Sequence, residues 1–391
     1  MSDVVIVGAK RTAIGSFLGQ FTGTPTPTLG SAAIAGALAQ SGLAADQVDE
    51  VIMGCVLPAG LGQAPARQAS RAAGIPDAAG ATTINKVCGS GMKAVMLAHD
   101  IIKAGSAKAV VAGGMESMTN APHLLNGSRT GVRYGSAEFL DHMAFDGLTN
   151  PYDGKAMGIF GDAACAKYGY DRAAIDAFSA ESARRAQAAQ ASGAFAAEIV
   201  PVTVKTRRGE AVVDKDEEPG KIDLNKIPEL RPAFGKEGVL TAASSSKISD
   251  GAAALVVMSA EAAAAAGVKP LARIVAHATH SQAPEWFTTA PVAALQSVLA
   301  KAGWSVADVD LFEVNEAFAC VAMAPMSDLG IAHDKLNVNG GALALGHPIG
   351  CSGARLLVTL THALQARGGK RGVASLCIGG GEATAVAIEL A

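Results

Sequence analysis

The chain has 391 residues, of which 50% are hydrophobic and 17% charged. This length and composition suffice for two or three domains with substantial cores and exclude an intrinsically disordered protein. The formal net charge of -3 argues against nucleic-acid binding, and no Lys- and Arg-rich helix suggests a membrane surface. We therefore expect a globular protein that acts on a small or acyl-carrying molecule.

The first residues include the strand-like run Val4 to Val7, without the basic region and long apolar stretch of a signal peptide. No segment is apolar over transmembrane length. The six cysteines are scattered and form no Cys-x-x-Cys pair, so neither a disulfide framework nor a zinc knuckle is expected. These features predict a cytoplasmic protein with reduced thiols.

The sequence contains an internal repeat. Leu-Ala-Gln-Ser-Gly precedes Val48, and Leu-Ala-Lys-Ala-Gly precedes Val309. At nearly the same spacing, the Gly-Ser-Gly after Cys88 and the Ser-Gly after Cys351 each open an apolar helical pattern that leads into a β-branched strand ending in glycines. The repeat predicts two copies of a strand–helix unit, hence an α/β fold with helices covering mixed sheets and ligands near strand ends where the copies meet.

A segment rich in loops and charge separates the two copies. We expect residues 1–118 with 250–270 to form the N-terminal half, 119–249 an inserted loop domain and 271–391 the C-terminal half. Within the insertion, residues 171–192 predict an amphipathic helix capped by Asp171 and stopped by Gly193. The basic residues of the inserted segment, Lys221 among them, could contact a phosphorylated cofactor or lie on a solvated surface.

Cys88 stands between an apolar stretch and a helix-forming one, so we expect it at a helix N-terminus. The free N–H groups and the helix dipole there favour a thiolate, and the small residues that follow let a thioester approach. The alternative is a cysteine that serves only as a small buried apolar residue.

Two further glycine-rich turns carry candidate catalytic groups. Pro348 keeps His347 out of helical geometry, which suits a presented imidazole, although a structural histidine is the alternative. Cys377 ends an apolar strand, and the N–H groups of the glycines that begin at Gly379 could form an oxyanion hole. The run is too close to the C-terminus for a dinucleotide-binding unit.

Asn315 follows a strand-like segment and could hold a water or act as an oxyanion donor, or else cap a helix. His277 and His280 form a His-x-x-His pattern, but no third cluster of ligands accompanies them. We therefore expect no metal site.

Four motifs together resemble the fingerprint of the thiolase family: Cys88-Gly89-Ser90, Asn315-Glu316-Ala317-Phe318, Gly346-His347-Pro348 and Cys377-Ile378-Gly379. The resemblance covers essentially the whole chain and is strongest to short-chain members. It implies a five-layer αβαβα fold of two duplicated halves with an inserted loop domain. It also implies an acetyl-CoA C-acetyltransferase that condenses two acetyl-CoA to acetoacetyl-CoA and CoA, or cleaves short 3-ketoacyl-CoA.

The resemblance also implies roles for the site residues. Cys88 is the nucleophile that accepts the acetyl group, His347 activates it, and Cys377 moves the proton of the second substrate. His347 and a water on Asn315 stabilise the enolate, while the N–H groups of Cys88 and Gly379 hold the acyl oxyanion. The resemblance implies CoA thioesters as substrates and no cofactor. It also implies a homodimer or a homotetramer.

By the same resemblance, several residues contact CoA or line the substrate cavity: Ser246, Met157, Ala317, Phe318, Phe287, Lys221 and Phe234. Ala156 stands where most short-chain members have a histidine. A phenylalanine at position 287 is similar to the members that also accept 2-methylacetoacetyl-CoA. Pro219 stands where those members have a tyrosine near a bound potassium ion, so we do not expect potassium to bind. Two alternatives remain, namely a decarboxylating ketosynthase-like enzyme and a catalytically weak acyl-CoA-binding subunit.

Overall fold

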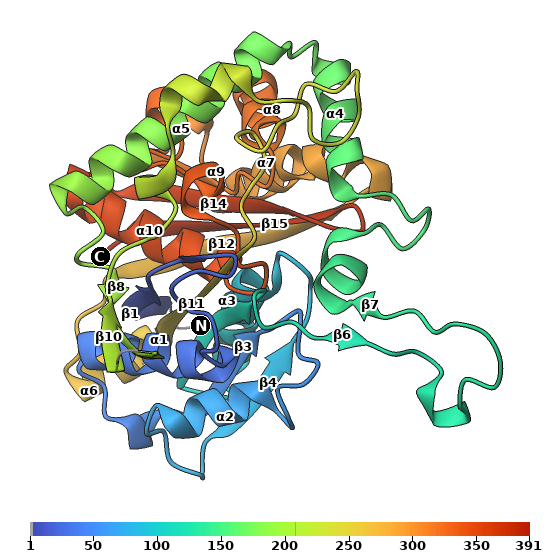
Figure 1. Cartoon of the computed structure of the whole chain (residues 1–391). Coiled ribbons are helices and arrows are strands. Elements are labelled where there is room, and N and C mark those ends of the chain that lie inside the picture. Colours follow the sequence, from blue (N-terminus) through green and yellow to red (C-terminus); the bar gives the residue numbers. More distant parts are fainter. Residues whose placement is uncertain (1–2, 208) are drawn as a thin grey trace.

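A computed structural model describes residues 3–207 and 209–391. Its main sheet follows the order β13-β14-β15-β12-β1-β11-β5-β3-β4. In the middle of this path, β1 and β12 pair only through Val5 with Arg273 and Ile6 with Ala272. The sheet therefore folds over at this junction into two halves that face each other, as Figure 1 shows.

The two halves have the same internal arrangement. The N-terminal half contains β4 (Gly80–Ile84), β3 (Glu50–Gly54), β5 (Ala109–Ser117), β11 (Ser249–Ser259) and β1 (Val4–Thr12). The C-terminal half contains β13 (Leu311–Val314), β14 (Arg371–Ile378), β15 (Glu382–Leu390) and β12 (Ala272–Ser281). In each half a parallel pair, β3–β5 or β13–β14, continues into two antiparallel pairs. The repeat in the sequence is therefore a repeat of structure.

Helices cover the sheets in three layers (Figure 1). The layers are α3 (Ser90–Lys103) and α10 (Ser352–Arg367) between the two halves, α1 (Thr26–Ser41) and α2 (Pro65–Ala72) outside the N-terminal half, and α7 (Ala290–Ala302) and α8 (Ala319–Leu329) outside the C-terminal half. Every residue of α10 from Ser352 to Leu364 is buried, as expected for a helix with sheets on both sides. The predicted five-layer αβαβα fold is confirmed.

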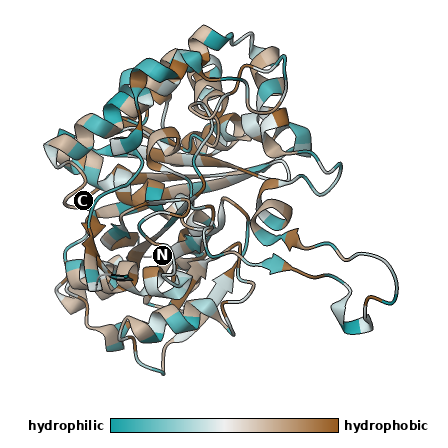
Figure 2. Ribbon diagram, viewed as in Figure 1, coloured by the Kyte–Doolittle hydropathy of each residue, from teal (hydrophilic) through white to brown (hydrophobic). Residues whose placement is uncertain are grey.

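Residues 119–248 form mostly short elements. They are β6 (His123–Leu124), β7 (Leu140–Asp141), η2 (Ser128–Thr130), η3 (Met143–Leu148), α4 (Met157–Tyr168), α5 (Arg172–Ser192), β8 (Ile199–Val200), β9 (Val202–Thr206), β10 (Gly209–Val213), η4 (Pro219–Lys221) and η5 (Leu224–Glu229). The β6–β7 segment extends away from the body of the molecule (Figure 1). Figure 2 shows many hydrophilic residues on α5, whereas the sheets are more hydrophobic. The domain boundaries stay a prediction.

The predicted ends of α5 are confirmed. The Asp171 side chain accepts a hydrogen bond from the Ala174 N–H at 2.8 Å, and Gly193 ends the helix with a φ of 74°.

A buried ion network ties the inserted residues 119–248 to β1. Arg11 donates two hydrogen bonds to Asp216, at 2.7 and 2.8 Å, and one to Glu198 at 2.6 Å.

The remaining short elements are β2 (Gly15–Ser16), α6 (Ala260–Ala266), α9 (Ala342–Leu345), η1 (Ala45–Gln47), η6 (Pro284–Thr289), η7 (Val306–Asp308) and η8 (His333–Lys335). Across the described residues, no helix is both long and apolar enough to span a bilayer.

Candidate active site

Cys88 lies in a strained turn between β4 and α3. Val87, directly before it, has a φ of 46°, a conformation that β-branched residues rarely adopt. Ser90 holds this turn, because its buried hydroxyl donates to the Val87 carbonyl at 2.6 Å and accepts the Lys86 N–H at 2.8 Å. The turn places Cys88 directly before Gly89, the N-cap of α3, as the sequence predicts.

The turn around Cys88 meets the end of β14, which carries Cys377. A β-carbon built on Gly89 would lie 2.3 Å from Cδ1 of Ile378, so only glycine allows this approach. The Gly379 N–H lies close enough to the Cys88 thiol to oppose the rise of its pKa. The structure therefore brings Cys88, Cys377 and Gly379 together from opposite halves of the chain.

His347 is buried in the turn before α10, and each of its ring nitrogens has a polar neighbour. Nδ1 lies 2.5 Å from the Ser352 hydroxyl, and Nε2 lies 3.4 Å from Nδ2 of Asn315. The Ser352 hydroxyl also contacts the Pro348 carbonyl at 3.0 Å, and a carbonyl can only accept. Nδ2 of Asn315 can only donate, so Nε2 of His347 accepts from it and is unprotonated. Nδ1 therefore carries the proton and donates to the Ser352 hydroxyl, which leaves Nε2 able to act as a base.

The His347 turn packs against the start of α3. A β-carbon on Gly91 would lie 3.0 Å from the Gly350 carbonyl oxygen and 2.9 Å from the Ala354 nitrogen. Cys88 also packs against a small apolar cluster that contains Ile349. The histidine turn and the Cys88 turn therefore border the same region.

Burial sets the protonation of both groups. It raises the pKa of Cys88 to about 11, although the N–H groups of Gly379 and Cys88 itself oppose the shift. It also lowers the pKa of His347 to about 3, and the nearby Arg355 adds to this effect. The backbone N–H groups favour the thiolate, as we expect from the sequence, but desolvation outweighs them and Cys88 stays a thiol. Near neutral pH both groups are uncharged, and the thiol needs a base to become a nucleophile.

Cys377 is fully buried at the end of β14. Burial raises the pKa of its thiol well above the usual value, and the neighbouring Cys88 adds to the shift. Two thiols this close resist being ionised together, so the site favours one thiolate at a time.

Asn315 has an unusual hydrogen-bonding state. Its backbone N–H donates to the Ser375 carbonyl at 3.0 Å, while its buried Oδ1 has no hydrogen-bond partner among the residues that the structure describes. Such an oxygen is the kind of group that an ordered water satisfies. The alternative role as a helix cap is excluded, because α8 begins later, at Ala319, with Phe318 as its N-cap.

Several predicted substrate contacts gather beside Cys377. Ala317, Phe318 and Phe287 share one buried apolar cluster with Cys377, and Met157 and Phe234 pack against that cluster. The Met157 methyl lies 3.4 Å from a β-carbon built on Gly379. The rings of Phe234 and Phe318 meet edge to face at 5.7 Å. Ala156, at the N-cap of α4, is exposed.

Lys221 lines a separate cavity of about 270 Å³ together with Lys226 and Lys247. Its ammonium group lies 2.8 Å from Oε1 of Glu217 and 2.8 Å from the Ser16 hydroxyl. Two links connect this cavity to the cysteine site. The Lys247 carbonyl accepts the His347 N–H at 3.0 Å, and Ser246, next to Lys247, donates its N–H to the Ala317 carbonyl at 3.0 Å.

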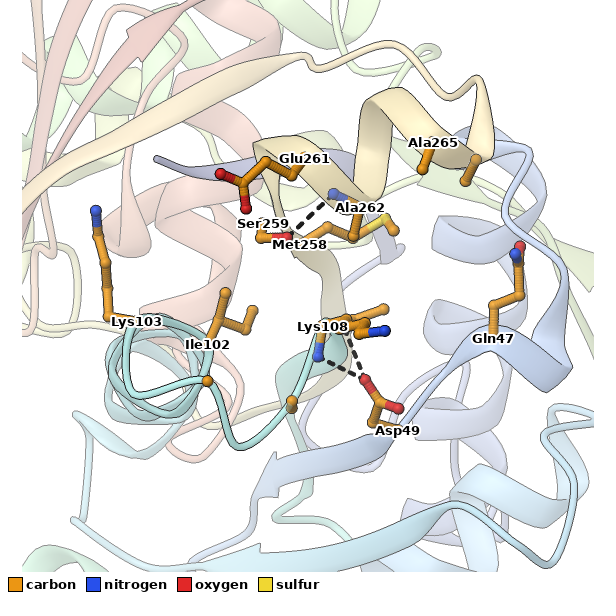
Figure 3. Close-up of a pocket in the computed structure, with 14 residues that line it drawn as sticks. Gln47, Asp49, Ile102, Lys103, Lys108, Met258, Ser259, Glu261, Ala262 and Ala265 are labelled. Carbon is orange, nitrogen blue, oxygen red and sulfur yellow. Dashed lines mark hydrogen bonds between the residues drawn. The ribbon is translucent and has the colours of Figure 1, made fainter. Parts of the chain in front are cut away.

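A cavity of about 750 Å³ lies elsewhere, near the C-terminal end of α3 (Figure 3). Asp49, Lys108 and Glu261 are among its lining residues, and the Asp49 carboxylate accepts the N–H groups of Lys108 and Ala109. None of the candidate site residues lines it. Since Cys88 precedes the other end of α3, this cavity is remote from the candidate site.

Two residues that shape the site were not predicted from the sequence. One is Ser352, which lies on the first turn of α10 and stands out in the sequence only as part of the repeat. The other is Glu116, a buried carboxyl that accepts the N–H groups of Val56, Leu57 and Gly350 at 2.9 to 3.1 Å. Burial raises the pKa of Glu116 to about 7 despite these bonds. A lone acidic residue within an apolar strand is the signal that could have revealed it.

Comparisons with known proteins agree with this arrangement. Residues 4–261 match the thiolase N-terminal domain, and residues 268–390 match the thiolase C-terminal domain. The chain is 51% identical to an acetyl-CoA acetyltransferase of Chromobacterium violaceum, with 99% of each chain covered. It is 50% identical to an acetyl-CoA acetyltransferase of Cupriavidus necator over the whole of both chains, and 49% identical to one of Escherichia coli over 100% of this chain and 99% of that one. The two matched domains together span almost all of the sequence, and the chain belongs to the thiolase family.

Proposed function

We propose that this protein is an acetyl-CoA C-acetyltransferase that condenses two acetyl-CoA into acetoacetyl-CoA and CoA, and that cleaves short 3-ketoacyl-CoA in the reverse direction. The close approach of the Cys88 turn to the end of β14, which carries Cys377, carries this proposal. The names of relatives about half identical over the full length support it.

The first half-reaction transfers an acetyl group to Cys88. Nε2 of His347 takes the thiol proton, and the sulfur attacks the thioester carbonyl. The N–H groups of Cys88 and Gly379 hold the oxyanion, a contribution of about 3 to 4 kcal/mol for each donor. Cys377 gives its proton to the departing CoA thiolate, which leaves Cys377 ionised and His347 protonated.

The second half-reaction forms the carbon–carbon bond. The Cys377 thiolate takes a proton from the methyl group of a second acetyl-CoA, while protonated His347 and a water on Asn315 stabilise the enolate oxygen. The enolate carbon attacks the acetyl group on Cys88 and displaces its sulfur, which recovers a proton from His347. Each group ends in its initial protonation state.

The cavity at Lys221, Lys226 and Lys247, which Glu218 and Asp223 also line, offers a net positive charge for the phosphates of CoA. Ser246, next to Lys247, donates its N–H to Ala317 of the apolar cluster that contains Phe318. We propose that pantetheine follows this route to the cysteines. A homodimer or homotetramer and a cytoplasmic location also belong to this proposal.

Thiolysis of acetoacetyl-CoA, 2-methylacetoacetyl-CoA and longer 3-ketoacyl-CoA by the purified protein tests the function. We expect CoA-dependent cleavage of the short substrates and an acetyl group on the peptide that contains Cys88 after incubation with acetyl-CoA. Decarboxylation of malonyl-CoA would instead favour a ketosynthase-like enzyme, and tight binding of acetoacetyl-CoA without turnover would favour a binding subunit.

A further inference from the structure

A cluster of two histidines and a carboxylate lies on the side of the molecule where α3 meets β12. Three potential metal-ligating atoms converge there: Nδ1 of His99 and Oδ1 of Asp100, both on α3, and Nε2 of His277 on β12. They lie 3.0 Å (His99–Asp100), 2.8 Å (His277–Asp100) and 3.2 Å (His277–His99) apart. The candidate active site uses none of these residues.

Ordinary hydrogen bonding does not satisfy all three contacts at once. When Asp100 is ionised, its oxygen can only accept. If both rings donate to that oxygen, their two N–H groups face each other at 3.2 Å. If one ring nitrogen is instead unprotonated, its lone pair faces the carboxylate oxygen at 2.8 or 3.0 Å, and both atoms can only accept. A cation at the centre removes this conflict, because all three atoms then present lone pairs to it.

The spacing also suits a metal ion. Donor atoms bound at about 2.0 to 2.1 Å lie about 3.3 Å apart on a tetrahedron and about 3.0 Å apart at adjacent corners of an octahedron. The three observed separations, 2.8 to 3.2 Å, lie close to these values. One open face remains for water, since the Asp100 side chain is 50% exposed whereas those of His99 and His277 are 14% and 18% exposed.

The ligand types also suit a divalent ion. The cluster offers two imidazoles and one carboxylate, and neutral imidazole and carboxylate are the forms that bind divalent ions. One charge opposes binding, because the Lys301 ammonium donates to the His277 carbonyl at 3.0 Å.

We propose that His99, Asp100 and His277 form a binding site for a divalent transition-metal ion such as Zn²⁺, which links α3 to β12. In the sequence, His277 stands out only together with His280. These two residues are three apart on one strand and so point to opposite faces, and His280 contacts Gln282 instead. The sequence around His277 shows no further ligand, because His99 and Asp100 lie far from it along the chain and only the fold brings them to it.

Calorimetric titration of the chelator-treated full-length protein with ZnCl₂ tests the proposal. We expect one ion per chain, with an affinity that falls about tenfold or more in His277→Ala and in Asp100→Asn. His280→Ala is the matched control and should bind like the unaltered protein. Equal affinity in the unaltered protein and His277→Ala, or no binding by the unaltered protein, would overturn the site.

Two further measurements distinguish this site from metal binding at the active-site thiols. Cys88→Ser should still bind Zn²⁺, and Co²⁺ bound to the unaltered protein should show no sulfur-to-metal charge-transfer band. Such a band, if lost in Cys88→Ser, would place the ion on the thiols and contradict the proposal. Zn²⁺ should also raise the Tm of the unaltered protein and not that of Asp100→Asn. We expect Asp100→Asn to fold, because the side chain at this position is half-exposed.

Discussion

The Ser352 hydroxyl lies 2.5 Å from Nδ1 of His347 and 3.0 Å from the carbonyl oxygen of Pro348. On the other side of the ring, Nδ2 of Asn315, which can only donate, lies 3.4 Å from Nε2, so Nδ1 carries the proton and the Ser352 hydroxyl accepts it. Ser352 is therefore a positioning residue for His347.

Ser352→Ala should lower kcat by about 10²-fold, since Nδ1 of His347 then loses the acceptor that orients the ring. The measurement is steady-state thiolysis of acetoacetyl-CoA over a range of pH. Thr361→Val is a matched control, because Thr361 is equally buried on the same helix and its hydroxyl donates to the carbonyl four residues earlier at 2.7 Å. Equal losses in both variants would show that only packing is involved.

The pKa of His347 predicts a pH dependence of stability. The folded protein keeps this imidazole neutral down to a pH of about 3, whereas the unfolded chain binds a proton below about 6.5. Its contribution to the free energy of unfolding is thus fully present above pH 6.5 and is lost as the pH falls from 6.5 toward 3. Within this window, the free energy of unfolding, measured with urea, should fall more steeply with decreasing pH in the protein than in His347→Gln. Equal dependence on pH in the two proteins would contradict the lowered pKa of His347.

The approach of Gly89 to Ile378 predicts a rescue experiment. Gly89 has a φ of -80°, which alanine can adopt, so the obstacle to Gly89→Ala is the Ile378 side chain 2.3 Å from the new methyl group. We expect Gly89→Ala to lower kcat/KM about tenfold or more by moving the Cys88 turn. Adding Ile378→Ala should recover part of the loss, so that the double-mutant cycle shows strong coupling. Additive losses would mean that the two turns are independent.

Separate roles for the cysteines predict different isotope-exchange defects. Cys88→Ala should form no acetyl-enzyme. Cys377→Ala should form it slowly from acetyl-CoA but should not exchange the methyl hydrogens of acetyl-CoA with solvent deuterium, because the base is missing. Mass spectrometry measures both reactions. Normal deuterium uptake by Cys377→Ala would reassign the base.

The cavity at Lys221 predicts a binding defect rather than a chemical one. Lys221→Gln should raise the KM for acetyl-CoA about three- to tenfold and leave kcat nearly unchanged, because a phosphate contact acts equally in the ground and transition states. An acetyl thioester of pantetheine, which lacks the nucleotide, should show no change in KM. Lys236→Gln, outside the cavity lining, is the control.

Features that depend on local backbone chemistry and on repetition could be predicted from the amino-acid order. They are the two copies, the insertion between them, the start of a helix after Cys88, and the ends of the 171–192 helix at Asp171 and Gly193. Turn residues, caps and apolar periodicity act over a few residues, so they are readable in one dimension.

The protonation states and the long-range pairings came from packing in three dimensions. Burial makes Cys88 a thiol rather than a thiolate, Asn315 selects the tautomer of His347, and the approach of α3 to β12 brings His99 to His277. Desolvation and contacts between distant segments depend on how the elements pack, and no spacing along the chain encodes that packing directly.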